Sequence, residues 1–339
     1  RNGFTKKGKR RYLCLECRSS FIRKKNRKVI FEDFINFYSF IKGKQNKEGL
    51  SEKTHLSRTT LWRRFTPFFS YLISPDKINK LFPVVSFLCW KPWVLGLDGK
   101  WLRRLGVVMI YRDVTDRINL YWSCHPSESY EAIRKDLDGL YPVVENNLPD
   151  GLISDWKNSI VASTEAYFPD AAYQRCLSHL KRQSSRLLPL RSPYAATQEL
   201  RKIALEIMHI YDPSDFYDWT VKLNVWIEKY SLFLKEKTIG VGTRKKWWYT
   251  HGNLRRAIRV LTQKHEYTFA YLKNPFLPKT NNSLEGTNSQ IDTKLGIHRG
   301  MKFNQQVSFI FWLLAFSRIK DLSDLKKLWD SLKNEIFAG

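Results

Sequence analysis

Hydrophobic positions follow two different periods along this chain and divide it into helical and strand-rich stretches. Apolar residues recur at helical spacing over residues 29–42, and two short helices joined by a turn are predicted for 48–66, with Ser51 and Ser57 as N-caps. Short apolar runs predict strands at 93–97, 107–111, 120–122, 151–154 and 171–174. Helices are predicted between them at 129–146 and 158–167. The mixture predicts an α/β fold class.

The strand signal disappears beyond residue 177. Residues 177–278 are rich in Leu, Lys, Arg and Trp at helical spacing, interrupted at Pro189, Pro193 and Pro213, and they predict an all-α region. A polar helix is then predicted from Asn281, and an apolar helix over about 304–318.

The charge of the chain narrows the choice of partner. There are 58 Lys and Arg residues against 32 Asp and Glu, a formal net charge of +26. Such an excess disfavours a compact state unless a polyanion neutralises it, and nucleic acid is the usual polyanion. A ribosome-associated or simply basic protein is the alternative. The first residues are polar and basic, and the longest apolar run, 307–316, is too short to span a bilayer. We therefore expect a cytoplasmic location and no membrane partner.

Three acidic residues stand out by context. Asp98 and Asp155 each follow a predicted buried strand, where α/β folds place their chemistry. Glu285 lies in the polar helix and shares one face with Asn281, Asn288 and Asp292. Three carboxylates can hold two Mg²⁺ ions for phosphodiester cleavage, with Mn²⁺ as a substitute ion. Ordinary strand-end and surface acids are the alternative for each residue taken singly.

Four segments carry a resemblance to a known family. They are LDGKWL at 97–102, ISDWK at 153–157, RCLSHLK at 175–181 and NNSLEGTN at 281–288. Together they resemble the DDE transposases of the Mutator-like superfamily, which includes many bacterial insertion-sequence transposases. The separations of 155 − 98 = 57 and 285 − 155 = 130 residues are similar to that family, which carries a helical insertion before the glutamate. The resemblance covers roughly residues 90–320.

The resemblance implies a fold, a reaction and a set of domains. It implies a ribonuclease-H-like mixed-sheet core, in two parts at 90–176 and 279–339, interrupted by the all-helical insertion at 177–278 and preceded by a zinc-ribbon-like region at 1–28 and a helix-turn-helix region at 29–80. Asp98, Asp155 and Glu285 would be the catalytic, Mg²⁺-binding triad of a transposase that cleaves DNA at terminal inverted repeats and transfers the strand to target DNA. A homodimer on two DNA ends and a bacterial, nucleoid-associated location are expected. A structure-specific nuclease or resolvase, and a domesticated non-catalytic DNA-binding regulator, are the alternatives.

The family also has a Cys-x-x-His motif, matched here by Cys176 and His179. Two interpretations stay open. In one, His179 lies beside the triad and contacts the scissile phosphate or orients a carboxylate. In the other, the pair is a packed cysteine and a hydrogen-bonded core histidine.

The N-terminal region carries two DNA-binding candidates. Cys14 and Cys17 resemble one half of a zinc ribbon, with free thiols as the alternative because zinc needs further ligands. Residues 49–65 resemble a helix-turn-helix, in which Ser57 would cap a recognition helix that reads the major groove of double-stranded DNA through Arg58, Thr59, Thr60, Arg63 and Arg64. A solvated basic helix is the alternative.

Further DNA contacts are expected beyond the triad motifs. Trp247 and Trp248 are candidates for stacking on exposed bases, although tryptophans at helical spacing are more often core residues. Lys294, His298 and Arg299 follow Glu285 and are candidates for phosphate contacts, with a solvated basic face as the alternative.

Overall fold

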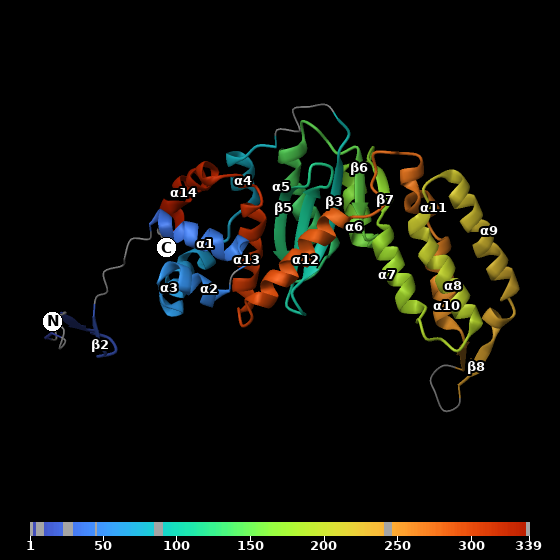
Figure 1. The fold of residues 1–339 in the computed structure, drawn as a ribbon, viewed down its shortest axis with the longest axis horizontal. Coiled ribbons are helices and arrows are strands. Elements are labelled where there is room, and N and C mark those ends of the chain that lie inside the picture. Colours follow the sequence, from blue (N-terminus) through green and yellow to red (C-terminus); the bar gives the residue numbers. More distant parts are fainter. Residues whose placement is uncertain are drawn as a thin grey trace.

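The computed structural model of the protein describes residues 3–4, 10–22, 30–44, 46–84, 91–240 and 246–336. Beyond the N-terminal hairpin, three parts follow one another along the long axis of the molecule (Figure 1). Helices from both ends of the chain pack together in the first, a five-stranded sheet forms the second, and a mainly helical part is the third. The predicted α/β class is confirmed. No helix within these ranges is long and apolar enough to cross a membrane.

The N-terminal residues form a small antiparallel hairpin. Its strands are β1 (Arg11–Leu13) and β2 (Ser20–Ile22), and Cys14 and Cys17 lie in the turn between them. The chain of the turn is closed by the Arg18 N–H, which donates to the Cys14 carbonyl at 3.0 Å. Arg18 has φ +55°, a left-handed conformation of the kind found in tight turns.

The helical end of the molecule is built around aromatic side chains. Phe37 packs on Phe68 with ring centroids 4.7 Å apart and on Trp312 at 5.4 Å, and all three side chains are buried. Because these residues come from both termini, the apolar helix predicted at 304–318 lies at the centre of this core. The helices are α1 (Phe31–Lys42), α2 (Lys47–Thr54), α3 (Arg58–Ser70), α4 (Pro75–Leu81), α13 (Phe303–Phe316) and α14 (Leu322–Ile336).

Two capped helices, α2 and α3, follow α1 as the sequence predicts. Ser57 caps α3 by accepting from the Thr60 N–H at 3.2 Å, so its predicted capping role is confirmed. The predicted N-cap role of Ser51 is wrong, because α2 begins at Lys47, four residues before Ser51. Asn46 caps it instead, accepting from the Gly49 N–H, while Ser51 lies inside the helix and donates to the Leu56 carbonyl.

The central sheet has the strand order β5-β4-β3-β6-β7. β3 pairs antiparallel with β4 and parallel with β6, so the sheet is mixed and β3 lies at its centre. The β3–β4–β5 meander needs only short turns, whereas β3 to β6 and β6 to β7 need crossovers, and helices supply them. The strands are β3 (Val94–Trp101), β4 (Val107–Asp113), β5 (Ile118–His125), β6 (Gly151–Ser154) and β7 (Ala172–Arg175).

The two faces of the sheet have different partners. Leu95, Leu97 and Leu152 form a core with the crossover helices α5 (Tyr130–Val144) and α6 (Asn158–Tyr167). The alternate residues Val94, Gly96 and Ile153 face the opposite side, toward α7 (Leu177–Leu187) and α12 (Asn282–Ile297). A Cβ at Gly96 would lie 2.9 Å from Asn281 Oδ1, so glycine allows the start of α12 to approach β3 closely.

The part between β7 and α12 is mainly helical, and its apolar core around Trp219 and Trp226 continues to Val94 and Ile153 of the sheet. The all-α prediction for 177–278 is wrong in one respect, because the chain also forms an antiparallel hairpin of β8 (Lys237–Ile239) and β9 (Trp247–Tyr249). Aromatic and β-branched residues fit a pleated ribbon better than a helix. The helices besides α7 are α8 (Ala195–Glu206), α9 (Pro213–Lys229), α10 (Gly252–Thr262) and α11 (His265–Thr268).

Candidate active site

Asp98 and Asp155 lie opposite one another on neighbouring parallel strands. The register pairs Val94 with Gly151, an offset of 151 − 94 = 57 residues, and the two aspartates have the same offset, 155 − 98 = 57. Continuing this register beyond the last pair, Gly96 with Ile153, therefore sets Asp155 beside Asp98 on the face toward α12. Neighbouring strands are about 4.8 Å apart, so the two carboxylates share one edge of the sheet.

The expected position of Asp98 at a strand end needs correction. Asp155 does follow the last residue of β6, but β3 continues through Asp98 to Trp101 because β4 pairs with it over that whole length. What ends near Asp98 is the parallel pairing, since β6 stops at Ser154. Asp98 therefore has a paired strand, β4, on one side and no paired strand on the other.

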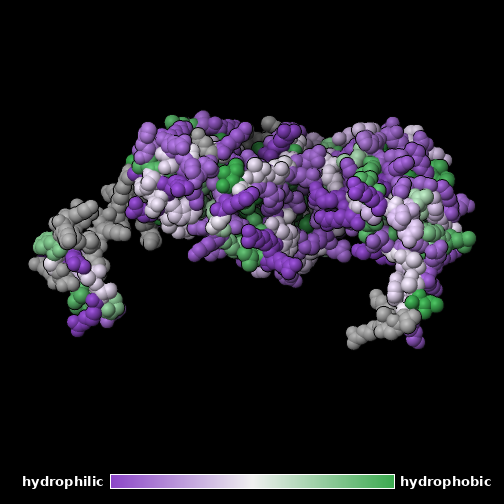
Figure 2. Space-filling model, turned by 60° about the horizontal axis from the view of Figure 1, so that its bottom comes forward, coloured by the Kyte–Doolittle hydropathy of each residue, from purple (hydrophilic) through white to green (hydrophobic). Residues whose placement is uncertain are grey.

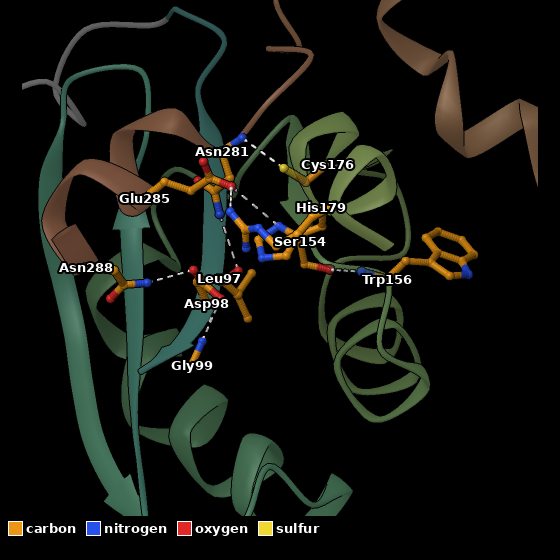
Figure 3. Close-up of polar contacts among 11 residues, drawn as sticks. Leu97, Asp98, Gly99, Ser154, Trp156, Cys176, His179, Asn281, Glu285 and Asn288 are labelled. Carbon is orange, nitrogen blue, oxygen red and sulfur yellow. Dashed lines mark hydrogen bonds and ion pairs between the residues drawn. The ribbon is translucent and has the colours of Figure 1, made fainter. Parts of the chain in front are cut away.

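The polar face of α12 meets β3, which bears out the predicted shared face. Asn288 Nδ2 donates to Asp98 Oδ2 at 2.7 Å (Figure 3), and this bond fixes the orientation of the Asp98 carboxylate. The neighbouring contacts of the face are Asn281 Nδ2 to the Leu97 carbonyl at 3.3 Å and Lys100 Nζ to Asp292 Oδ2 at 2.5 Å. These contacts lie before and after Glu285 along the helix, so α12 is aligned with β3 on both sides of Glu285.

Glu285 itself points toward α7. Its Oε1 lies 3.8 Å from His179 Nδ1 and 3.3 Å from Arg182 Nη2. Among the described residues, the ligand-type atoms of Cys176, His179 and Glu285 lie within 4.8 Å of one another, and the two aspartates are not members of that group. The strand register thus sets Asp98 and Asp155 side by side, and the third predicted acid lies in the same region. Figure 3 shows Glu285 turned to Cys176 and His179.

Negative charge accumulates around Asp98. Burial, followed by the nearby charges of Asp155, Glu128 and Glu285, raises the pKa of this carboxyl to about 7, while the hydrogen bond from the Gly99 N–H opposes the change. Carboxylates disfavour each other's ionisation only at short range. Asp155, Glu128 and Glu285 therefore all lie close enough to Asp98 to act on its carboxyl group.

Glu128 is the acid that sequence reasoning missed. It is buried just before α5, its Oε2 accepts from Lys157 Nζ at 2.5 Å, and a methyl group added at Gly99 would collide with its Oε1. Its carboxylate therefore lies against the backbone next to Asp98. One weak signal in the sequence points to it, namely an acidic residue directly before the Ser129 cap of the helix that follows β5.

His179 lies beside the predicted triad. Burial lowers its pKa, and the charges of Asp155 and Glu285 oppose that change, so the imidazole is close to both carboxylates. Its Nδ1 is buried and has no hydrogen-bond partner. The interpretation of His179 as a hydrogen-bonded core histidine therefore does not hold for Nδ1. The predicted contact of His179 with a phosphate is untested.

The predicted DNA-reading residues of α3 divide into two groups. Arg64 turns inward and its Nη1 bonds to Asp33 Oδ1 at 2.8 Å, where it neutralises a carboxylate that is 1% exposed. The guanidinium therefore has an internal partner in this structure, and its predicted DNA contact is untested. Arg58, Thr59 and Arg63 are exposed and Thr60 is half-buried, and Arg58 pairs with the exposed Glu48 at 2.6 Å. Their role remains a prediction.

Two of the three predicted phosphate contacts after Glu285 are contradicted. Lys294 is buried, and its Nζ donates to the carbonyls of Lys42 and Gly43 at the end of α1. His298 is also buried, with its ring 4.2 Å from that of Phe40. Both side chains help hold α12 on α1, as the long apolar stem of a lysine and an imidazole ring can. Arg299 is exposed, and its predicted contact is untested.

Trp247 and Trp248 lie on the β8–β9 hairpin and are 47% and 41% exposed. They are not core residues, so the alternative weighed from the sequence is wrong. Figure 2 shows the hairpin projecting from one end of the molecule, and Ile239 on the facing strand is 76% exposed. Lys237 Nζ lies 4.1 Å from the centre of the Trp247 ring, so an aromatic surface and a positive charge occur together.

Cys14 and Cys17 are free and share one turn, as half of a zinc site would require. Hydrogen bonds from Ser19 lower the pKa of Cys17 to about 7, which favours the thiolate. No third or fourth ligand accompanies them among the described residues, so the zinc prediction stays open.

No family model matches the sequence. A search of curated proteins finds no match either.

Proposed function

We propose that this protein is a DNA transposase of the DDE class, with a ribonuclease-H-like core whose acids are Asp98, Asp155 and Glu285. The strand order β5-β4-β3-β6-β7, with one antiparallel meander and two parallel crossovers, supports that core. The observation that carries the proposal is the common offset of the two aspartates and the parallel strands, together with the helix that delivers a third acid to the same side of β3.

The donor set fits magnesium. Three carboxylates are hard oxygen ligands, and Mg²⁺ prefers such ligands and completes its shell with water and substrate phosphate. When bound, the ions would stabilise charge on the phosphoryl oxygens and make water a better nucleophile. The gathering of carboxylates around Asp98 is the kind of site in which a cation is expected.

The residues of the chain would have separate tasks. Asp98 is oriented by Asn288, and Asp155 is held at the end of β6, where Lys157 N–H donates to its Oδ1 at 3.2 Å. Glu285 would complete the set from α12. In the proposed reaction, water breaks a phosphodiester bond to give a 3′-hydroxyl and a 5′-phosphate. The 3′-hydroxyl then attacks a phosphodiester of the target DNA, forms a new bond to its phosphorus and releases a 3′-hydroxyl of the target strand.

The net charge and two sets of exposed side chains support DNA as the substrate. The formal net charge of +26 favours a polyanionic partner, and the exposed residues Arg58, Thr59 and Arg63 lie on one capped helix. The exposed tryptophans of the β8–β9 hairpin are suited to stacking on bases at a distorted end. Two DNA ends must be held at once for joining, so we expect a homodimer on DNA.

The test is a cleavage and joining assay with end-labelled duplexes taken from the DNA that flanks the coding sequence, in Mg²⁺ or Mn²⁺, with a supercoiled plasmid as target. The parent should nick the duplex and join it to the plasmid, and Asp98→Asn and Glu285→Gln should do neither. Glu145→Gln, an exposed acid at the end of α5, is the matched control and should keep both activities. Nicking without joining would favour a nuclease, and activity in Asp98→Asn would refute the assignment.

A further inference from the structure

A cluster of three potential metal ligands includes Glu285 but neither aspartate. The Cys176 Sγ, a His179 ring nitrogen and a Glu285 oxygen all lie within 4.8 Å of one another. Cys176 is the N-cap residue of α7, His179 lies in the first turn of that helix, and Glu285 comes from α12. Two elements far apart in sequence therefore supply three chemically different ligands to one point (Figure 3).

The distances are close to those of a metal site. Two nitrogen or oxygen ligands about 2.1 Å from a tetrahedral ion are about 3.4 Å apart. The His179 Nδ1 to Glu285 Oε1 distance is 3.8 Å, so a small movement of either side chain would reach this value.

The surroundings of the cluster also favour a ligand. His179 Nδ1 is buried without a hydrogen-bond partner, and a buried polar atom left in that state is costly. The Asn281 N–H donates to Cys176 Sγ at 3.3 Å, an interaction that would stabilise a thiolate. Arg182 now pairs with Glu285, but its side chain is half exposed and can be displaced into solvent.

We propose that Cys176, His179 and Glu285 form a binding site for a thiophilic divalent cation, with zinc as the best match. Sulfur, imidazole and carboxylate are the ligands that zinc uses, whereas Mg²⁺ avoids thiolates. Binding releases the Cys176 thiol proton to solvent, and the fourth position is left to water. Glu285 is shared with the proposed catalytic set, so zinc at this site would draw its carboxylate away from Asp98 and Asp155. This last consequence rests on the proposed function, and the binding site itself does not.

Cobalt(II) titration of the full-length chain tests the site directly. Co²⁺ replaces zinc and gives a sulfur-to-metal charge-transfer band when a thiolate binds it. The titration is made in a Cys14→Ser, Cys17→Ser background, which removes the N-terminal thiols. The band should appear there, persist with Cys124→Ser as the matched control, and disappear with Cys176→Ser. His179→Gln should weaken binding at least tenfold, about the lower limit seen even for changes outside the ligand shell.

His179→Gln also covers the case in which Cys176→Ser fails to fold, because the histidine side chain is 21% exposed and less tightly packed than the fully buried cysteine. A band that survives Cys176→Ser, an absent band in the background protein, or unchanged affinity in His179→Gln would overturn the proposal.

The shared carboxylate is tested separately. In the cleavage assay, zinc added at constant Mg²⁺ should inhibit the parent, and the ratio of activities with and without zinc should return toward one in Cys176→Ser. Equal inhibition of both proteins would overturn the competition. A parent without any DNA cleavage would refute the proposed function and leave the cobalt result standing, so the two failures are distinguishable.

Discussion

The residue after Asp155 has a backbone conformation that side chains rarely adopt, and it offers a sharp test of the structure. Trp156 has φ +67° in the left-handed region, which is a genuine outlier for a bulky residue. Its ring packs on Tyr267 and Tyr173, with centroids 4.5 Å and 5.3 Å away. The ring contacts therefore hold a strained turn that directs the chain from β6 past Asp155 and into α6.

Replacing Trp156 by glycine or alanine separates strain from packing. Both changes remove the ring and its contacts equally, so their difference reports the backbone alone. Alanine keeps a penalty of about 1–2 kcal/mol for the left-handed conformation, which glycine does not have. Glycine loses about 0.4–1 kcal/mol more through the entropy of its unfolded chain. The glycine variant should therefore be the more stable of the two by roughly 0.5–1 kcal/mol.

The measurement is the free energy of unfolding of both variants in guanidinium chloride, followed by far-ultraviolet circular dichroism. The matched control is Lys202, an exposed residue inside α8. There the order should be reversed, with alanine more stable than glycine by about 1 kcal/mol. A Trp156→Ala variant as stable as Trp156→Gly, or more so, would refute the left-handed turn after Asp155.

Three further perturbations test the site and the helices that hold it. Glu128→Gln removes a charge that raises the pKa of Asp98, so that pKa should fall from about 7, as followed by carbon NMR of the carboxyl group; an unchanged titration would contradict their proximity. His298 is buried with its pKa lowered to about 4, so the folded state binds fewer protons than the unfolded one and stability should be lost as pH falls from 6.5 through 4. The loss is at most about 3 kcal/mol and should be missing in His298→Asn, in unfolding experiments at pH 7 and 4.5. Arg64→Ala leaves the buried Asp33 without its partner and should cost about 3 kcal/mol of stability, whereas Arg63→Ala should change stability by less than about 0.5 kcal/mol and weaken DNA binding; equal stability losses would contradict their different placement.

The sequence was sufficient wherever a residue's environment follows from its neighbours along the chain. The predicted strand at 151–154 coincides with β6, because a parallel strand that is covered on both faces is a short, continuous apolar run. The polar face of α12 was also predictable, since i, i+3 and i+4 spacing fixes which side chains point the same way. That face contacts β3 through the hydrogen bond from Asn288 to Asp98, because the polar side of the helix turns toward the carboxylate.

The sequence is a poor guide to a side chain whose environment is supplied by a distant segment of the chain. Lys294 has the sequence context of a surface cation, and only the end of α1, more than 250 residues earlier, supplies the carbonyl groups that bury it. Arg64 is similar, because its partner Asp33 belongs to another helix. Glu128 could not be found by strand-end reasoning, because it reaches Gly99 from the start of a helix. Pairwise tertiary contacts of this kind leave no periodic trace in a single sequence.

The register between β3 and β6 determines where Asp98 and Asp155 lie relative to each other. Leu95 pairs with Leu152, and both enter the core under α5 and α6, while Ile153 enters the core on the other face. A slip of β6 by one residue would exchange these faces and turn Asp155 toward the apolar core, where an unpaired carboxylate is costly. Because both faces of β6 are apolar and buried, the cost of burying Asp155 distinguishes the two registers, and the observed register sets the two carboxylates side by side. A residue inserted in the loop between α5 and β6 would change the 57-residue separation without moving either aspartate, so the strand pairing, and not the spacing in the sequence, holds the two carboxylates together.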